Sequence, residues 1–265
     1  MKSNALNILY RVCDSVENYN SARITGRKKD VILKSFSSLI DSIDFLKKKR
    51  SDTIINLHIV YDKTSKETKD KFLEIGKAKN ISFVEHSTSN NQYGNMASFK
   101  LCYNIAKDFK GYIFFLEDDY LLDKRCCYEM FSFLNMWTDD SHICLKPHQD
   151  SYIFTRDQVV NRTHYRQREI FLGAGVYWFR DITSTCTFCI DDFILKESKD
   201  NFEKTFLLPR VDEQHLNRMY ERFPLFSPIL SLGIHFHSQV CFPPFFAGQE
   251  FKGIEYDAKG VLKNQ

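Results

Sequence analysis

An uninterrupted apolar run leads straight into three adjacent carboxylates at residues 112–119, YIFFLEDD. A run of this kind is typical of a strand that is covered on both faces of a parallel sheet. Neighbouring carboxylates repel one another, and an unpaired charge is costly to bury. The fold must therefore end this strand where a cation, a set of backbone amides or water compensates Glu117, Asp118 and Asp119.

Apolar strands and helical patterns alternate along the first half of the chain. Strands are expected at residues 7–12, 54–61, 81–85 and 112–116. Helices are expected between them at residues 31–48, 66–77 and 95–109. Because parallel strands need crossover connections, this alternation predicts the α/β class: a doubly wound, mostly parallel sheet with right-handed crossovers and helices on both faces.

The second half of the chain has a looser pattern. Strands are expected at 142–146, at 169–180 as a strand or hairpin, and at 226–237, with helices at 183–196 and 212–220. No repeat or clear linker interrupts the chain, and its 265 residues, 43% of them hydrophobic, suffice for a full core. We therefore predict a single domain over residues 1–265, ending in a tail at 251–265.

The net charge, the length of the hydrophobic stretches and the cysteines limit where the protein can act in the cell and what it can bind. The formal net charge of +3 is weaker than the dense basic footprint of strong nucleic-acid binders. No stretch has the length needed to cross a bilayer and the N-terminus lacks a signal-peptide pattern, so we expect a cytoplasmic protein, in the host cytoplasm if it is viral. The eight cysteines are irregularly spaced, and Cys186-x-x-Cys189 lacks a second metal-binding pair, so we expect free thiols.

Acidic residues follow three of the first four expected strands: Asp14, Asp62 and the E-D-D triplet. In an open parallel sheet, ligands bind beyond the carboxyl ends of the strands. The chain contains neither G-x-G-x-x-G nor G-x-x-x-x-G-K-[ST], so no glycine-rich loop of these kinds holds a phosphate. Carboxylates suit a hard divalent cation that bridges to substrate phosphates. These acids predict Mg²⁺ or Mn²⁺ bound against a nucleoside diphosphate.

Several motifs together resemble the GT-A fold glycosyltransferases, most closely their small phage and bacterial members. They are the Arg and Asp that end the first strand, the Asp that ends the second, GNMASF at 94–99, the DXD-like EDDY at 117–120, YWFRDITSTCTF at 177–188 and GIHFHSQ at 233–239. The resemblance covers residues 7–245. It implies a metal-dependent transfer of a sugar from a nucleotide-diphosphate sugar to an acceptor hydroxyl, with the donor bound by residues 7–123 and the acceptor and catalytic half at 124–250.

The resemblance also assigns residues to the nucleotide sugar. Four of them would line the nucleobase and ribose pocket: Tyr10, Arg11, Asp14 and Asp62. At the start of the helix 95–109, Asn95 and Ser98 would meet the donor sugar or phosphate, a place that the helix dipole also favours for an anion.

The metal ligands implied by the resemblance come from two segments. Asp119 would bind the metal directly, while Glu117 or Asp118 would contact the ribose or the waters of the metal. His235 or His237 is a further candidate ligand, because residues two apart in a strand point to the same side.

A catalytic base is needed if the transfer inverts the anomeric centre, because a carboxylate must take the proton of the attacking hydroxyl. The resemblance places this base at the start of the helix 212–220, as Asp212 or Glu213, with Asp212 preferred. Arg210 and Arg218 would stabilise the leaving diphosphate. A retaining mechanism would need no base there.

Other interpretations of the same residues stay open. A nucleotidyltransferase or phosphohydrolase would use the same acids but release pyrophosphate or phosphate, and a non-catalytic module would bind nucleotide without metal. Asp212 and Glu213 also suit the first turn of any helix through its dipole. His235 and His237 also suit an ordinary half-buried strand.

Two acceptors compete. One is a hydroxyl on a glycan, and the other is the hydroxymethyl group of a modified DNA base, which would have to leave the base stack. The basic stretch 156–168 would contact the DNA phosphates, whereas the weak net charge favours the glycan.

Overall fold

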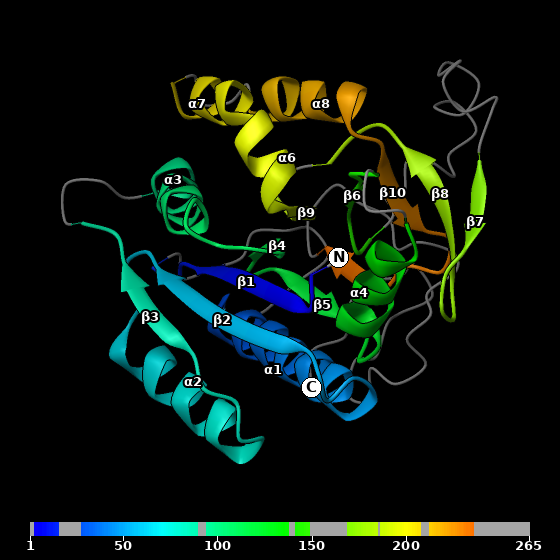
Figure 1. Cartoon of the computed structure of the whole chain (residues 1–265). Coiled ribbons are helices and arrows are strands. Elements are labelled where there is room, and N and C mark those ends of the chain that lie inside the picture. The colour runs from blue at the N-terminus through cyan, green and yellow to red at the C-terminus, as the bar shows by residue number, and fades with distance from the viewer. Residues whose placement is uncertain are drawn as a thin grey trace, which may run out of the picture.

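The computed structural model (Figure 1) describes residues 3–15, 28–89, 94–137, 141–148, 169–184, 186–207 and 212–235, with the backbone alone for 212–214. Its centre is a nine-stranded sheet in the order β3-β2-β1-β4-β9-β6-β10-β8-β7. These strands are β1 Ala5–Val12, β2 Ile54–Tyr61, β3 Val84–Ser87, β4 Tyr112–Glu117, β6 Cys144–Leu145, β7 Ile170–Leu172, β8 Tyr177–Asp181, β9 Phe188–Asp191 and β10 Leu225–Pro228. A small second sheet pairs β5 Tyr120–Leu122 with β11 Gly233–His235.

The strand directions confirm the predicted α/β class. β3, β2, β1 and β4 are parallel to one another, and β6 is parallel to β10. β9 and β8 run against their neighbours on both sides. The chain passes from β1 to β2 and β3 on one side and reaches β4 on the other, so the connection reverses direction between β1 and β4.

Helices cover both faces of the sheet, as Figure 1 shows. α1 Lys28–Lys49, α2 Lys66–Ala78 and α4 Cys126–Met136 pack on one face. α3 Asn95–Ala106, α6 Asp192–Glu197, α7 Lys199–Leu207 and α8 Asp212–Arg222 pack on the other. Side chains of β1 alternate between the two cores, with Ile8 and Tyr10 toward α1 and Leu9 toward α3.

The strands of the first half were predictable because their apolar runs are long. β2 begins and ends as predicted, while β3 begins three residues later than expected, at Val84. The hairpin expected at 169–180 forms as β7 and β8. The β segment expected at 226–237 divides into β10 and β11, which belong to different sheets.

The prediction of a helix over 183–196 is wrong for its first part. Residues 188–191 form β9, which lies between β4 and β6, and only 192–197 are helical. A short buried apolar run such as FCI cannot be assigned to strand or helix by its periodicity alone. Asp191 ends the strand and caps the helix, since its side chain accepts a hydrogen bond from Ile194 N.

A fully buried ion pair joins the central strands of the second half. Lys146 follows β6 and its Nζ lies 2.9 Å from Asp181 Oδ2, with both side chains at most 1% exposed. Ser227 Oγ donates to the same carboxylate at 2.7 Å, and Lys146 Nζ also donates to Thr183 O at 2.8 Å. The pair fixes the ends of β6 and β8 against β10.

Asp181→Asn should lower the free energy of unfolding by about 3–5 kcal/mol, because it leaves the buried ammonium without this counter-charge. Adding Lys146→Met should recover most of the loss. Urea denaturation measures both, with Glu197→Gln in the exposed Arg222–Glu197 pair as a control that should cost less than about 1 kcal/mol. A loss below about 1 kcal/mol for Asp181→Asn would contradict the role of the pair.

Candidate functional site

A cavity of about 430 Å³ opens at the carboxyl ends of β1, β2 and β4. It lies between β1 and β4, where the chain direction reverses, which is the usual ligand position in open α/β sheets. The first residues of α1 and α3 complete its wall. The cavity therefore combines the strand-end acids with cations that other elements supply.

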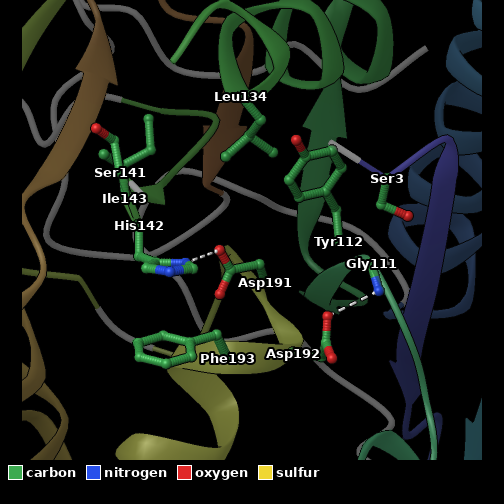
Figure 2. Close-up of a pocket in the computed structure, with 10 residues that line it drawn as sticks. All are labelled: Ser3, Gly111, Tyr112, Leu134, Ser141, His142, Ile143, Asp191, Asp192 and Phe193. Carbon is green, nitrogen blue, oxygen red and sulfur yellow. Dashed lines mark hydrogen bonds and ion pairs between the residues drawn. The ribbon is translucent and has the colours of Figure 1, made fainter. Parts of the chain in front are cut away.

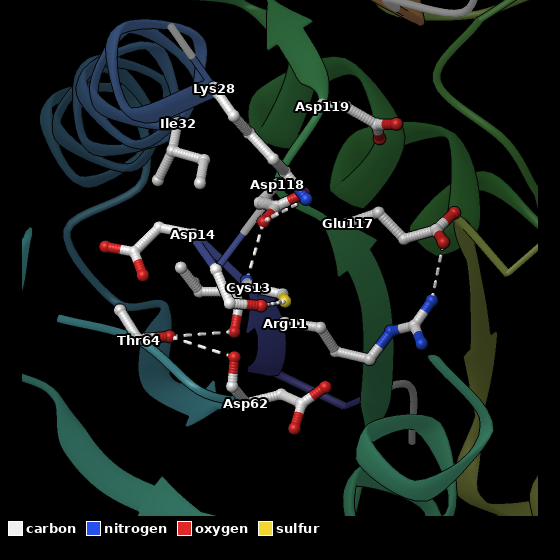
Figure 3. A network of polar contacts seen from close by, with 12 residues as sticks. Arg11, Cys13, Asp14, Lys28, Ile32, Asp62, Thr64, Glu117, Asp118 and Asp119 are labelled. Carbon is white, nitrogen blue, oxygen red and sulfur yellow. Dashed lines mark hydrogen bonds and ion pairs between the residues drawn. The ribbon is translucent and has the colours of Figure 1, made fainter. Parts of the chain in front are cut away.

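Arg11 holds three elements together beside this cavity (Figure 3). Its Nη2 donates to Glu117 Oε1 at 2.7 Å, and Glu117 is its partner in the β1–β4 register. Its Nη1 donates to Asn95 O at 2.9 Å and also to Asn95 Oδ1. The guanidinium lies 5.0 Å from the centre of the Phe99 ring. Arg11 is 4% exposed and lines the cavity. The arginine expected in the base pocket is therefore also part of the buried framework of the site.

The first two acids of the E-D-D triplet have partners within the protein. Thr187 Oγ1 donates to Glu117 Oε2 at 3.3 Å. Asp118 Oδ2 accepts the Cys13 N–H at 2.8 Å and lies 3.6 Å from Lys28 Nζ. The compensation that the sequence demanded for these two acids comes from protein cations and a backbone amide.

Asp119 turns away from its neighbours toward the small sheet. Its Oδ2 lies 3.3 Å from His235 Nε2, since the β5–β11 register sets His235 opposite Tyr120. The His235 ring stacks on the Tyr120 ring with centroids 4.4 Å apart and planes at 5°. The His148 ring makes T-shaped contacts with both rings. The structure therefore brings together two of the three residues expected as metal ligands, Asp119 and His235.

Burial shifts the pKa of the first two acids of the triplet. It raises the pKa of Asp118 from 3.8 to about 7, opposed by the charge of Lys28. It raises the pKa of Glu117 as well, opposed by Arg11. A positively charged ligand would stabilise the ionised forms, so its binding should release protons near neutral pH.

Two of the residues expected to line the base and ribose pocket have other tasks. Tyr10 is 0% exposed, packs on Phe36 and Phe72, and donates to Ser35 Oγ, because it points to the face opposite Arg11. Asp14 accepts hydrogen bonds from the N–H and hydroxyl of Ser65, the N-cap of α2, and from Thr68 Oγ1. Burial opposes ionisation of Asp14, but these bonds outweigh it and lower its pKa. Both residues serve the framework.

Asp62, Asn95 and Ser98 do line the cavity. Asp62 accepts the Gly94 N–H at 2.8 Å and the Thr88 hydroxyl at 2.9 Å, so it anchors the start of α3. The N-cap of α3 is Gly94, at φ +98°, and not Asn95, which is the first helical residue. The Ser98 hydroxyl lies within hydrogen-bonding distance of two backbone oxygens at the start of α3, Gly94 O at 3.2 Å and Asn95 O at 3.0 Å.

Several predicted residues lie outside the described residues. They are Arg210, His237, the basic stretch 156–168 and the side chains of Asp212 and Glu213. The backbone of α8 does begin at Asp212, as expected. Arg218 is described on α8 but does not line the cavity.

Sequence reasoning missed cavity residues that come from outside the acidic motifs. Lys28, Lys63 and Cys13 line the cavity, and Thr187 supports Glu117. A lysine at a helix start and a threonine in a β-branched run carry no signal of their own in the sequence. The described cysteines are free, as expected, and all but Cys13 are buried.

The side chains near Asp119 could bind a divalent cation only if a substrate supplied further ligands. Within the described ranges, no group of three or more His, Cys, Asp or Glu side chains is arranged to hold a metal ion. Asp119 and His235 offer two ligands, and Mg²⁺ commonly takes one or two carboxylates and completes its shell with water and substrate phosphates.

The described helices include none that is long and apolar enough to cross a membrane.

No protein-family model matches this chain, and no curated protein matches it. Among solved structures, it is similar to a Bacillus anthracis protein described as a glucose-1-phosphate thymidylyltransferase, in complex with a sucrose, at TM-score 0.46 and 14% identity over 84% of this chain and 85% of that one. It is also similar to the bifunctional glycosyltransferase WbbM, with a TM-score of 0.46 and 8% identity. That match covers 83% of this chain and 37% of WbbM. The galactosyltransferase LgtC, in complex with donor and acceptor sugar analogues, matches with a TM-score of 0.38 and 12% identity. That match covers 83% of this chain and 72% of LgtC. At these identities and TM-scores, function has to be argued from the site itself.

Asp118→Asn should remove a pH dependence of stability. A carboxyl whose pKa is raised by folding stabilises the protein while protonated, and this contribution is lost as pH rises from about 4 to about 7. The variant should therefore gain stability relative to the natural protein between pH 5 and pH 8, by about 2–3 kcal/mol. Urea denaturation at both pH values measures this, with the exposed Asp41→Asn as control. Parallel profiles for Asp118→Asn and the natural protein would contradict the shift.

Proposed function

We propose that this protein is a glycosyltransferase that binds a nucleotide-diphosphate sugar and a divalent cation in the cavity between β1 and β4. The observation that carries the proposal is the charge of this cavity at the topological switch point. Its wall has three cationic side chains, Arg11, Lys28 and Lys63, and four carboxylates: Asp62, Glu117, Asp118 and Asp119. The formal balance is −1 when all four acids are ionised.

A diphosphate would be repelled by such a wall unless a cation came with it. Arg11 and Lys28 are paired with Glu117 and Asp118, so they offer only part of their charge to a ligand. Mn²⁺ or Mg²⁺ held by Asp119 and His235 would neutralise the diphosphate and make it a better leaving group. The chain itself would orient the nucleotide with Asp62 and the first turn of α3.

The acceptor side of the reaction belongs to the second half of the chain. Asn217 of α8 accepts the Ser184 N–H at 3.2 Å, Ser184 Oγ donates to Thr187 O, and Thr187 contacts Glu117. These bonds tie α8 to the acid triplet, which supports a base at the start of α8. Asp212 or Glu213 would take the proton of the acceptor hydroxyl, and Arg210 would stabilise the leaving diphosphate.

Asp119→Asn should abolish Mn²⁺-dependent binding of nucleoside diphosphates and leave the protein folded. Calorimetric titration with UDP, GDP, ADP, CDP and dTDP, with and without Mn²⁺, measures this, and a ligand at a hundred times its Kd should add about 2.7 kcal/mol of stability. Asp41→Asn is the matched control. Unchanged affinity in Asp119→Asn would refute the metal site.

The products decide the class of reaction. Nucleotide sugars supplied with Mn²⁺ and an acceptor should yield a nucleoside diphosphate, whereas pyrophosphate or phosphate would indicate a nucleotidyltransferase or phosphohydrolase. Glycans and hydroxymethylcytosine-containing DNA are both supplied. A sugar adduct on the DNA base, with a rate that falls steeply with salt, would identify the DNA acceptor.

Neutralising the general base should slow turnover by about 10²–10⁴ without loss of donor binding. Asp212→Asn and Glu213→Gln test the two candidates, with the exposed Glu221→Gln at the other end of α8 as control. Near-full turnover in both variants would place the base elsewhere or indicate a retaining mechanism.

A further inference from the structure

A second cavity, of about 210 Å³, lies at the other end of β4, where that strand begins; Figure 2 shows the residues that line it. Its wall comes from the start of β4, the end of β9, the first turn of α6 and the segment before β6. The length of β4 separates it from the acid triplet by about 17 Å. It is a site distinct from the proposed donor site.

His142 is fixed in one orientation in this cavity. Its Nδ1 lies 2.6 Å from Asp191 Oδ2, and because a carboxylate can only accept, Nδ1 carries the hydrogen. Its ring stacks on Phe193 with centroids 4.0 Å apart and planes at 16°. Nε2 makes no hydrogen bond to any described part of the protein, so it can bind a ligand.

The two carboxylates of the wall are anchored but keep acceptor capacity. Asp191 Oδ1 accepts the Ile194 N–H, and Asp192 Oδ1 accepts the Gly111 N–H at 3.0 Å. A carboxylate oxygen has two lone pairs, so each can also accept from a ligand. The cavity is therefore rich in acceptors, and a ligand must bring donors.

Both carboxylates of the wall already have a donor beside them. Asp191 Oδ2 accepts from His142 Nδ1, and Asp192 Oδ2 lies 3.1 Å from Lys110 Nζ. A free anion would meet two carboxylates, and a cation would compete with these donors. A neutral ligand that supplies hydroxyl donors meets neither obstacle.

Apolar surface completes the cavity. Leu134 and Ile143 line one part, and the Tyr112 ring and Phe193, which is 42% exposed, line the rest. A ligand with both hydroxyl donors and an apolar C–H face would match this surface. The volume limits it to about one six-membered ring with its substituents.

We propose that this cavity binds a single neutral sugar ring, held by hydroxyl hydrogen bonds to Asp191, Asp192 and His142 Nε2 and by contact with the apolar wall. The proposal is independent of the function assigned to the donor site.

Saturation-transfer NMR and calorimetric titration of the full chain with glucose, galactose, mannose and N-acetylglucosamine test it. At least one of these sugars should bind, and His142→Phe and Asp191→Asn should each weaken it at least tenfold. Asn keeps the oxygen that caps α6, and Phe keeps the stack on Phe193, so both variants should fold.

Two controls separate this site from others. Tyr177→Ala, at an exposed aromatic on β8, and Asp119→Asn, in the donor site, should leave the sugar affinity unchanged. Failure of all four sugars to bind, or binding that survives both His142→Phe and Asp191→Asn, would overturn the proposal. Tighter binding of inorganic phosphate or of choline than of every sugar would overturn it as well.

Discussion

The ion pair between Arg11 and Glu117 is the contact on which the proposed donor site depends. The two residues are register partners on β1 and β4, and both side chains lie on the face that α3 covers. The same guanidinium binds Asn95 at the start of α3, so one side chain fixes two strand ends and one helix end. Removal of either charge would leave the other buried without its main partner, at a cost of about 3–5 kcal/mol. Loss of the pair would therefore disturb the wall of the cavity, which both residues line.

Successive residues of a strand point to opposite faces of the sheet, and this alternation decides where the other side chains near the cavity lie. Tyr10 points to the α1 core while Arg11 points to the cavity, and Glu117 faces Arg11 while Asp118 faces Cys13 and Lys28. The sequence shows which residues end a strand, but it does not show which face each side chain takes. That is why Arg11 lines the cavity while Tyr10 is buried in the α1 core.

The parts that were predictable are those with long, regular patterns. The parallel strands β1, β2 and β4 follow from their apolar runs, and their acids converge because the carboxyl ends of parallel strands share an edge. β9 could not be predicted, because three buried residues between two polar segments fit a helix equally well. Lys28 and Thr187 could not be predicted either, since each reaches the acids through contacts distant in sequence. Asp14 was misassigned because a strand-end acid that anchors the next helix looks the same in sequence as one that binds a ligand.

The partners of the carboxylates give the two ends of β4 different chemistry. At the carboxyl end, four carboxylates meet three cations, and burial raises the pKa of Asp118 and Glu117, so a cation that enters would stabilise their ionised forms. At the amino end, Asp191 accepts from the His142 ring and Asp192 lies beside Lys110, so each carboxylate already has a donor. These contacts support our proposals of a metal-bound anion at one end of β4 and a neutral ring at the other. What distinguishes the two sites is which donors neighbouring elements bring to each carboxylate, and only the folded chain determines them.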